Sequence, residues 1–408
     1  MSKRKSDVIT AKATKGVNGR MYYFAQSDVH GTRPINESMY NDILEKRGKI
    51  AGEDLWSGRK RKSSSRRRSL SRRSSSSKKK RSASKQEETD DDDEDAAKYE
   101  ITFSKAESQA GREYMEDVSL ILPHLRLADH FYTLAVVCDG HGGARAARFF
   151  VEHLATQLER SASAVQKSQE GDADNESKTL HATINGAVNR LMKMWEAHAK
   201  TDELGDGSTV SIVLVNEHSA HVYQYTLGDS RSCVVLPLTD KGGVWLTHCT
   251  PQHETENAEE RMRIETKTNC VIVRKFILNA NEKINESGPT SALNMTRSFG
   301  DLHNNFTSCI RRDGDFRSFS FDSVQKRDSV RLLIGSDGLF DLIDTYRTQN
   351  KTKATYGVPA ELPAGMPDRS LQHASGWLKL VEKQLGSRFL QSWDNVCVIT
   401  LHIQKLGH

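Results

Sequence analysis

The stretch from Arg59 to Arg81 limits what this chain can fold into more than any other part of it. Its 23 residues comprise 13 Lys or Arg, nine Ser and a single Leu. One apolar side chain in such a stretch cannot offset the entropy lost on ordering, so we expect it to be disordered. An acidic run, residues 87–95, follows at once. The sequence therefore predicts an N-terminal extension without a motif over residues 1–58, a disordered basic and then acidic tail over 59–98, and a folded domain over 99–405.

The charge of the chain divides at the same place. Residues 1–99 hold 25 Lys and Arg against 15 Asp and Glu, and the rest of the chain holds 34 against 39. The net charge of +5 therefore belongs to the N-terminal quarter, and the folded domain is acidic. The start lacks an apolar leader and no run approaches about 18 apolar residues, so we expect neither secretion nor a membrane span. The six cysteines include no Cys-x-x-Cys pair, which favours reduced thiols over a disulfide frame or a zinc site.

Three interpretations of the basic tail stay open at this stage. It is a solvated linker, a nuclear-localisation patch carried by residues 59–62 and 78–81, or an RNA-binding arm with Arg-Ser steps. Ser69, Ser74 and Ser82 are candidate regulatory phosphorylation sites, because each phosphate would add about −1.5 to −2 charge among basic residues. We expect a nuclear or cytoplasmic protein that contacts nucleic acid, if at all, only through this tail.

From Tyr99 onward, short apolar runs rich in β-branched and aromatic residues alternate with longer amphipathic segments. The short runs predict strands, and apolar residues three and four apart in the longer segments predict helices. The predicted strands are Val118–Leu122, Phe131–Cys138, Thr209–Val215, Ala220–Leu227, Val330–Gly335 and Val396–Ile403, and the predicted helices are Ala144–Glu159, Lys178–Ala199 and Ser370–Leu385, with a loop over Ser161–Glu176. Paired strands with helices between them favour a layered α+β fold with antiparallel sheets over a βαβ barrel.

Acidic residues stand at the ends of these predicted strands. They are Asp139 and Asp337 after two of them, Asp394 before a third, and the pair Glu116-Asp117 before a fourth. Burying a carboxylate alone costs several kcal/mol or shifts its pKa, so these residues need a partner or a ligand. If they converge, oxygen ligands without cysteine predict a hard cation such as Mg²⁺ or Mn²⁺. Taken singly, each is better explained as a turn residue or a helix cap.

The most informative segment is Asp139-Gly140-His141-Gly142-Gly143. Three glycines in five residues let the backbone approach a ligand closely and turn tightly into the following helix. A lone histidine is usually structural, but His141 lies in such a turn beside a carboxylate, which makes it a candidate for proton transfer.

Seven short motifs together resemble the metal-dependent Ser/Thr protein phosphatases of type 2C. In chain order they are Gly111–Asp117, Asp139–Gly143, Gly207–Thr209, Leu227–Arg231, Thr296–Asp301, Ser336–Asp341 and Asp394-Asn395. Each is weak alone, but all seven occur in the family's order between Tyr99 and Ile403. The resemblance implies a β-sandwich of two antiparallel sheets flanked by α-helices, in four layers α-β-β-α, with a two-metal site at one end.

The resemblance also implies a role for each candidate residue. Asp139 would bridge two Mg²⁺ or Mn²⁺ ions, the Gly140 carbonyl would bind one of them, and Asp337 and Asp394 would complete the other. Glu116 would bind through water, and Asp117 would orient a water on the metal. Arg112, whose planar fork suits two phosphate oxygens, would hold the substrate, and His141 would protonate the leaving seryl or threonyl oxygen. Two cations about 3.5–4 Å apart suit such a phosphoryl transfer.

The sequence departs from the family pattern at His248–Pro251, and residues 266–290 match it poorly. We expect a monomeric enzyme that hydrolyses phosphoserine and phosphothreonine in phosphoproteins, with no membrane partner. Two alternatives stay open. One is a catalytically silent module that keeps the fold to bind a partner, and the other is an RNA-associated protein that acts through the basic tail.

Overall fold

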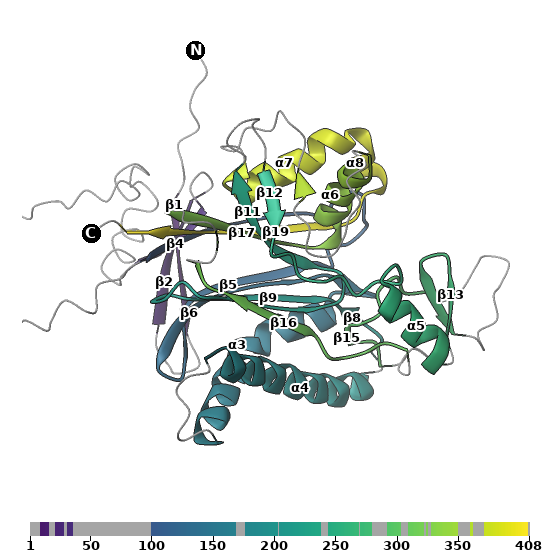
Figure 1. Cartoon of the computed structure of the whole chain (residues 1–408), viewed down its shortest axis with the longest axis horizontal. Helices are drawn as coiled ribbons and strands as arrows, with labels where there is room; N and C mark the ends of the chain where they lie inside the picture. Colours follow the sequence, from purple (N-terminus) through teal and green to yellow (C-terminus); the bar gives the residue numbers. More distant parts are fainter. Residues whose placement is uncertain are drawn as a thin grey trace, which may run out of the picture.

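Two antiparallel sheets pack face to face in the computed structural model, and helices cover both outer faces (Figure 1). The structure describes residues 9–15, 21–27, 31–35, 99–168, 176–202, 204–237, 244–268, 270–279, 292–302, 309–321, 324, 328–349, 360–361 and 371–406. Within these ranges the predicted α+β class, with antiparallel sheets between helical layers, is confirmed. No helix in the described part of the chain is both long enough and apolar enough to cross a membrane.

The larger sheet is built around β19, which pairs with β4 on one side and β17 on the other. Its order is β1 (Ile9–Lys15), β2 (Met21–Ser27), β3 (Gly31–Ile35), β4 (Tyr99–Ser108), β19 (Val396–Lys405), β17 (Ser329–Gly335), β11 (Arg231–Pro237), β12 (Val244–Thr247) and β18 (Ala360–Glu361). β3 reaches β4 through the pairing of Thr32 with Phe103, so strands of the N-terminal extension continue this sheet.

The second sheet has five strands, and two small sheets lie beyond its end. Its order is β16 (Asp315–Phe319), β10 (Val222–Leu227), β9 (Val210–Asn216), β6 (His130–Cys138) and β5 (Val118–Leu127). One small sheet joins β15 (Phe299–Gly300), β8 (Gly207–Ser208) and β7 (Gly140–His141), and the other is the hairpin of β13 (Cys270–Val273) and β14 (Phe276–Asn279).

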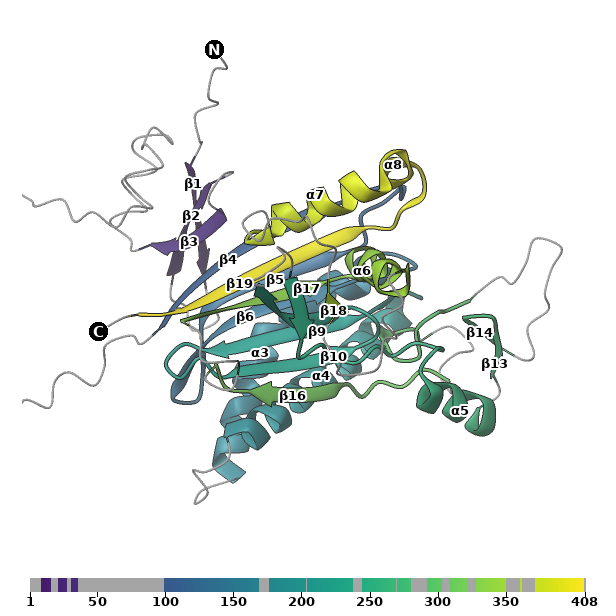
Figure 2. The ribbon, with the colours of Figure 1, turned by 45° about the horizontal axis from the view of Figure 1, so that its top comes forward.

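Helices cover the two outer faces of the sandwich. α3 (Arg145–Ser168) and α4 (Glu176–Asp202) pack on the five-stranded sheet, and α6 (Asp337–Gln349), α7 (Ala374–Leu385) and α8 (Ser387–Ser392) lie over the larger one. α5 (Ala258–Lys267) projects with the β13–β14 hairpin at the end of the molecule opposite β1–β3 (Figure 2).

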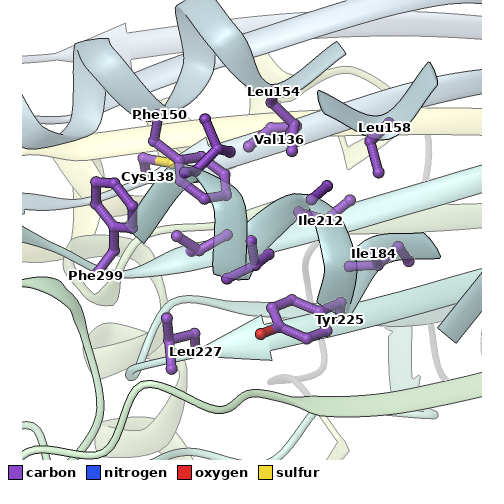
Figure 3. Packing of buried hydrophobic residues seen from close by; sticks show 14 of the residues in the cluster. Val136, Cys138, Phe150, Leu154, Leu158, Ile184, Ile212, Tyr225, Leu227 and Phe299 are labelled. Atoms are coloured by element: carbon purple, nitrogen blue, oxygen red, sulfur yellow. The ribbon is translucent and has the colours of Figure 1, made fainter. Parts of the chain in front are cut away.

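β6 shows why the central strands are apolar along most of their length. Its alternate residues face different layers: Val136 and Cys138 pack with helix α3, as Figure 3 shows around Phe150 and Leu154. Ala135 and Val137, on the other side of the strand, pack toward the larger sheet. A strand buried on both faces loses the polar alternation of a half-exposed strand. This strand therefore places Asp139, the residue after it, at the edge of a fully apolar layer.

All six predicted strands and all three predicted helices are present, with shifted ends. The predicted loop over Ser161–Glu176 is wrong in its first half, because α3 continues to Ser168. Leu158 and Ala162 are both buried and lie four residues apart, so the apolar face of the helix continues past Glu159. Polar residues in this turn bond within the helix, as the Ser161 hydroxyl does to the Gln157 carbonyl at 2.6 Å. Residues 169–175 lie outside the described residues.

The prediction that all six cysteines are thiols is wrong for two of them. Cys270 and Cys309, 39 residues apart, form a disulfide with a Cα–Cα distance of 6.3 Å. Both lie in a small buried cluster with Ile264 and Ile277, under α5 and the β13–β14 hairpin. Packing of that cluster, and not a local spacing motif, brings the two sulfurs together. The other four cysteines are not in disulfides.

Candidate active site

Asp139 lies at the end of β6, and its backbone is held by the segment that begins at Gly207. The Asp139 N–H donates to Oγ1 of Thr209 at 3.0 Å, and the Thr209 N–H donates to the Asp139 carbonyl at 2.8 Å. The Ser208 hydroxyl donates to the same carbonyl at 3.1 Å. The Gly-Ser-Thr motif therefore orients the Asp139 backbone where the strand ends.

The glycine turn after Asp139 packs directly on the segment that carries Glu116. A Cβ at Gly140 would lie 2.7 Å from the Glu116 carbonyl oxygen, so only glycine allows this approach. The Glu116 carboxylate in turn accepts a hydrogen bond from the Gly143 N–H at 2.7 Å. One oxygen of Glu116 thus orders the turn, which is a role that sequence reasoning missed.

Asp337 and Asp394 come from neighbouring strands of the larger sheet. Asp337 is the first residue of α6, just after β17, and Asp394 lies two residues before β19. Ser336 joins the two strand ends: its N–H donates to the Cys397 carbonyl at 3.1 Å, and its Oγ accepts from the Cys397 N–H at 3.0 Å. The carboxylates of Asp337 and Asp394 therefore lie at the same end of the paired strands β17 and β19.

Asn395 ties these strands to the segment that holds Arg112 and Asp117. Its amide donates to the carbonyls of Gln109 and Tyr114, at 2.9 Å and 3.1 Å. Its side-chain oxygen accepts from the Glu116 N–H at 2.8 Å. The sequence marked Asn395 only as the last residue of a motif, and its three tertiary contacts explain why that position carries an amide.

The carboxylates lie close enough to oppose one another's ionisation. Burial raises the pKa of Asp117 to about 8, and the charge of Asp337 adds to this rise. Burial, with the charge of Asp394, raises the pKa of Asp337 to about 7. The pKa of Asp139 is also raised well above its ordinary value, through burial and the charge of Asp117. Asp117 and Asp337 therefore retain protons near neutral pH unless a cation replaces them.

The donor set fits a hard divalent cation. Both carboxylate oxygens of Asp117, and Oδ1 of Asp337 and of Asp229, have no hydrogen-bond partner among the described residues. Buried oxygens of this kind need a donor or a metal ion. Carboxylate oxygens are the ligands that Mg²⁺ and Mn²⁺ prefer. Among the residues that the structure describes, no group of three or more His, Cys, Asp or Glu side chains is arranged so that it could hold a metal ion as it stands.

Arg112 lies at the exposed side of this cluster. One of its terminal nitrogens donates to Oδ2 of Asp394, while its side chain remains 55% exposed. Asp394 also accepts from the Asn395 N–H at 2.8 Å. Arg112 thus has one donor committed to a neighbour and a guanidinium that a solute can reach.

His141 is paired through one ring nitrogen only. Its Nε2 lies 2.9 Å from both carboxylate oxygens of Asp301, which is 160 residues further along the chain. Burial alone would lower the pKa of His141, but the carboxylate of Asp301 outweighs it and the pKa is raised. Asp301 was part of a sequence motif, but nothing in the sequence assigned it this contact.

A cavity of about 420 Å³ opens beside Asp337 and is strongly acidic. It is lined by Asp229, Gln252, Glu254, Glu256, Lys275, Asn294, Asp337, Asp341, Asp344 and Trp393. Burial raises the pKa of Glu254 to about 7. Asp229 is 2% exposed and its pKa is raised well above the ordinary value by burial and by Asp337. The sequence signal for Asp229 was its Gly-Asp-Ser-Arg motif, which carried no assigned role.

The structure thus brings together seven of the predicted site residues around the ends of β6, β17 and β19, and it places Arg112 at their exposed side. The remaining candidates, Ser69, Ser74 and Ser82, lie outside the described residues. The tail over 59–98, the monomeric state and the nuclear or cytoplasmic location stay predictions.

Comparison with known proteins identifies the family. The model of the family described as Protein phosphatase 2C matches residues 101–347. Protein phosphatase 2C 1 of Paramecium tetraurelia is 24% identical over 269 residues, which are 63% of this chain and 79% of that protein. The integrin-linked kinase-associated serine/threonine phosphatase 2C of Bos taurus is 28% identical over 172 residues, which are 39% of this chain and 44% of that protein.

Solved structures show the same fold. A serine-threonine phosphatase 2C from Toxoplasma gondii superposes with a TM-score of 0.51 at 19% identity, covering 74% of this chain and 95% of the other. A C. elegans sex determining protein superposes with a TM-score of 0.52 at 18% identity, covering 74% of this chain and 64% of the other.

Proposed function

The chain belongs to the protein phosphatase 2C family, and on that premise we propose that it hydrolyses phosphoserine and phosphothreonine in proteins with two Mg²⁺ or Mn²⁺ ions at its carboxylate cluster. The observation that carries the proposal is the proximity of Asp117, Asp139 and Asp337, whose pKa values are all raised, together with the unpartnered carboxylate oxygens of Asp117 and Asp337. Such a cluster is unfavourable by itself and becomes favourable around divalent cations. The family as a whole depends on Mg²⁺ or Mn²⁺, which agrees with this donor set.

Asp139, the Gly140 carbonyl, Asp337 and Asp394 would hold the ions directly, with Glu116 acting through water. Bound there, two divalent cations supply a nucleophilic water at neutral pH and neutralise charge on the transferred phosphoryl group. Asp117, buried and with both oxygens available, orients the attacking water.

Two residues of the chain act on the substrate itself. Arg112 binds the phosphate: its guanidinium is exposed, and Asp394 holds it at the mouth of the site. A planar fork of N–H donors suits two phosphate oxygens. His141 donates a proton to the departing seryl or threonyl oxygen, for which a raised pKa is the appropriate shift.

The proposal is tested by hydrolysis of a phosphothreonine peptide with Mn²⁺, with Mg²⁺ and with EDTA. We expect turnover that requires metal and is lost in Asp139→Ala and Asp337→Ala. Asp129→Asn, in an exposed turn between β5 and β6, is the matched control and should keep full turnover. Undiminished turnover in EDTA, or a folded protein inactive with both metals, would contradict the proposal and favour a silent binding module.

A further inference from the structure

The described residues contain four pairs of a histidine with a carboxylate. They are His124–Glu217, His141–Asp301, His198–Asp202 and His253–Asp315. The first and third have half-exposed histidine rings, while His253 and His141 belong to the interior, with side-chain exposures of 1% and 22%. The two interior pairs allow a direct comparison of how a ring is used.

Both ring nitrogens of His253 are occupied by the protein. Its Nδ1 accepts from the Gly228 N–H at 3.0 Å, and its Nε2 lies 3.3 Å from Asp315. This is the pattern of a structural histidine. His141 differs, since Nε2 is paired with Asp301 while Nδ1 is buried and has no hydrogen-bond partner among the described residues. Asp301 therefore holds Nε2 of His141, while Nδ1 can still form a hydrogen bond with a bound molecule.

The small sheet of β7, β8 and β15 creates this pairing. His141 in β7 pairs with Gly207 in β8, and Gly207 pairs with Gly300 in β15, just before Asp301. A Cβ at Gly207 would overlap both Nε2 of His141 and Oδ2 of Asp301. The two side chains therefore meet in the space that the missing Cβ of Gly207 leaves open.

Asp301 is itself held firmly in place. It is 1% exposed, its N–H donates to the Asp206 carbonyl at 3.2 Å, and the Ser298 hydroxyl donates to its Oδ2. Its φ of +52° lies in the left-handed region, which is unfavourable for a residue with a Cβ. Surrounding structure must impose such a conformation, and conformations of this kind concentrate at functional sites.

We propose that Asp301 is a positioning residue that accepts the Nε2–H of His141 and so directs Nδ1–H to the leaving oxygen of the substrate. The inference rests on the proposed function and goes beyond it by assigning the proton to one nitrogen. The oxygen of water forms the new bond to phosphorus, and the bond from phosphorus to the seryl or threonyl oxygen breaks. The Nδ1 proton moves to that oxygen to give the free hydroxyl, and the proton lost by the attacking water returns to the ring through solvent. The Nε2–H bond to Asp301 is kept throughout.

The test uses the dependence on the leaving group. A seryl or threonyl oxygen needs a proton to depart, whereas p-nitrophenolate departs without one. In Asp301→Ala we expect kcat for a phosphothreonine peptide to fall about 100-fold, with KM unchanged and kcat for p-nitrophenyl phosphate within about threefold of wild type. In Asp301→Asn, kcat for the peptide should fall less than in Asp301→Ala, because the amide oxygen still accepts the Nε2–H.

A second readout is independent of turnover. In the NMR spectrum of the metal-free protein, we expect a downfield ring N–H resonance that is absent from both His141→Asn and Asp301→Ala. The double variant His141→Asn/Asp301→Asn should be no slower on the peptide than His141→Asn alone, since both changes remove one function.

The matched control is Asp315→Asn, which removes the carboxylate from the structural pair. In this variant, kcat should either fall by the same factor for the phosphothreonine peptide and p-nitrophenyl phosphate or stay unchanged for both. If kcat in the Asp301 variants falls equally for both substrates, Asp301 has a structural role and not a positioning one. The same conclusion follows if the losses of kcat in the Asp301 and His141→Asn variants are additive. Wild-type protein that hydrolyses neither substrate with either metal would overturn the proposed function and this inference with it.

Discussion

The guanidinium of Arg112 donates to the carboxylate of Asp394, which lies 282 residues further along the chain. The contact joins the proposed phosphate-binding residue to a proposed metal ligand in one hydrogen-bonded unit. Arg112→Ala should raise KM for a phosphopeptide by about 10- to 100-fold, as expected for loss of a charged hydrogen bond. Arg112→Lys should recover only part of this, since a point charge lacks the fork. Steady-state kinetics and inhibition by inorganic phosphate measure both effects. Arg126→Ala, another exposed arginine, is the control, and an unchanged KM in Arg112→Ala would refute the assignment.

The carboxylate cluster should make stability depend on pH and metal together. The pKa values of Asp117 and Asp337, about 8 and about 7, are raised above the unfolded value of about 3.9. In metal-free protein their contribution to stability is therefore complete below pH 4 and is lost as pH rises through 7 to 8. Bound Mg²⁺ reverses this, so the rise in melting temperature on adding Mg²⁺ should be larger at pH 8 than at pH 6. An equal or smaller rise at pH 8 would contradict the cluster as the metal site.

Asp117→Asn separates the cost of burying a charged carboxylate from the stabilisation by bound Mg²⁺. Without metal, the variant should melt at a higher temperature than wild type at pH 8, because one buried charge is gone. On addition of Mg²⁺, the melting temperature of the variant should rise by less than that of wild type. Scanning calorimetry with EDTA and with Mg²⁺ measures both, and a variant less stable than wild type in EDTA at pH 8 would count against the electrostatic argument.

Gly207 offers a test of the space in which His141 and Asp301 meet. Gly207→Ala should displace one of these side chains, costing about 1–3 kcal/mol of unfolding free energy and most of the activity on phosphopeptides. Gly205→Ala, two residues away, would place its Cβ where nothing lies within 4 Å and should change neither. Chemical denaturation and peptide turnover measure the difference. Equal behaviour of the two variants would mean that the space over Gly207 is not needed.

The disulfide between Cys270 and Cys309 should be detectable by alkylation. Unfolded protein should take up four alkyl groups without reductant and six after reduction, since the remaining four cysteines are not in disulfides. Cys270→Ser should lower the unfolding free energy by up to about 4 kcal/mol, the chain-entropy value for a loop of this length. Cys249→Ser is the control and should have little effect. Six alkyl groups before reduction would show that the thiols predicted from the sequence are present after all.

Local signals in the sequence were sufficient for much of the fold. The run from Phe131 to Cys138 is apolar at every position because both faces of the strand are buried, and the run predicted the strand for that reason. The carboxylates Asp139, Asp337 and Asp394 could be named because short motifs surround them and strands end beside them. Helix ends were less certain: Ser161 looks like a loop residue in the sequence, yet its hydroxyl bonds one turn back inside α3.

Contacts between residues far apart needed the tertiary structure. The pairings of His141 with Asp301, Arg112 with Asp394 and Cys270 with Cys309 join residues that no local pattern relates. A periodic pattern records which face of a strand or helix is buried, but it does not record which other element covers that face. The sequence by itself therefore determined the family, the layers and the set of acidic residues. Only the packing of β7, β8 and β15 around Gly207 decided that Nε2 of His141 is paired with Asp301 and that Nδ1 has no hydrogen-bond partner among the described residues.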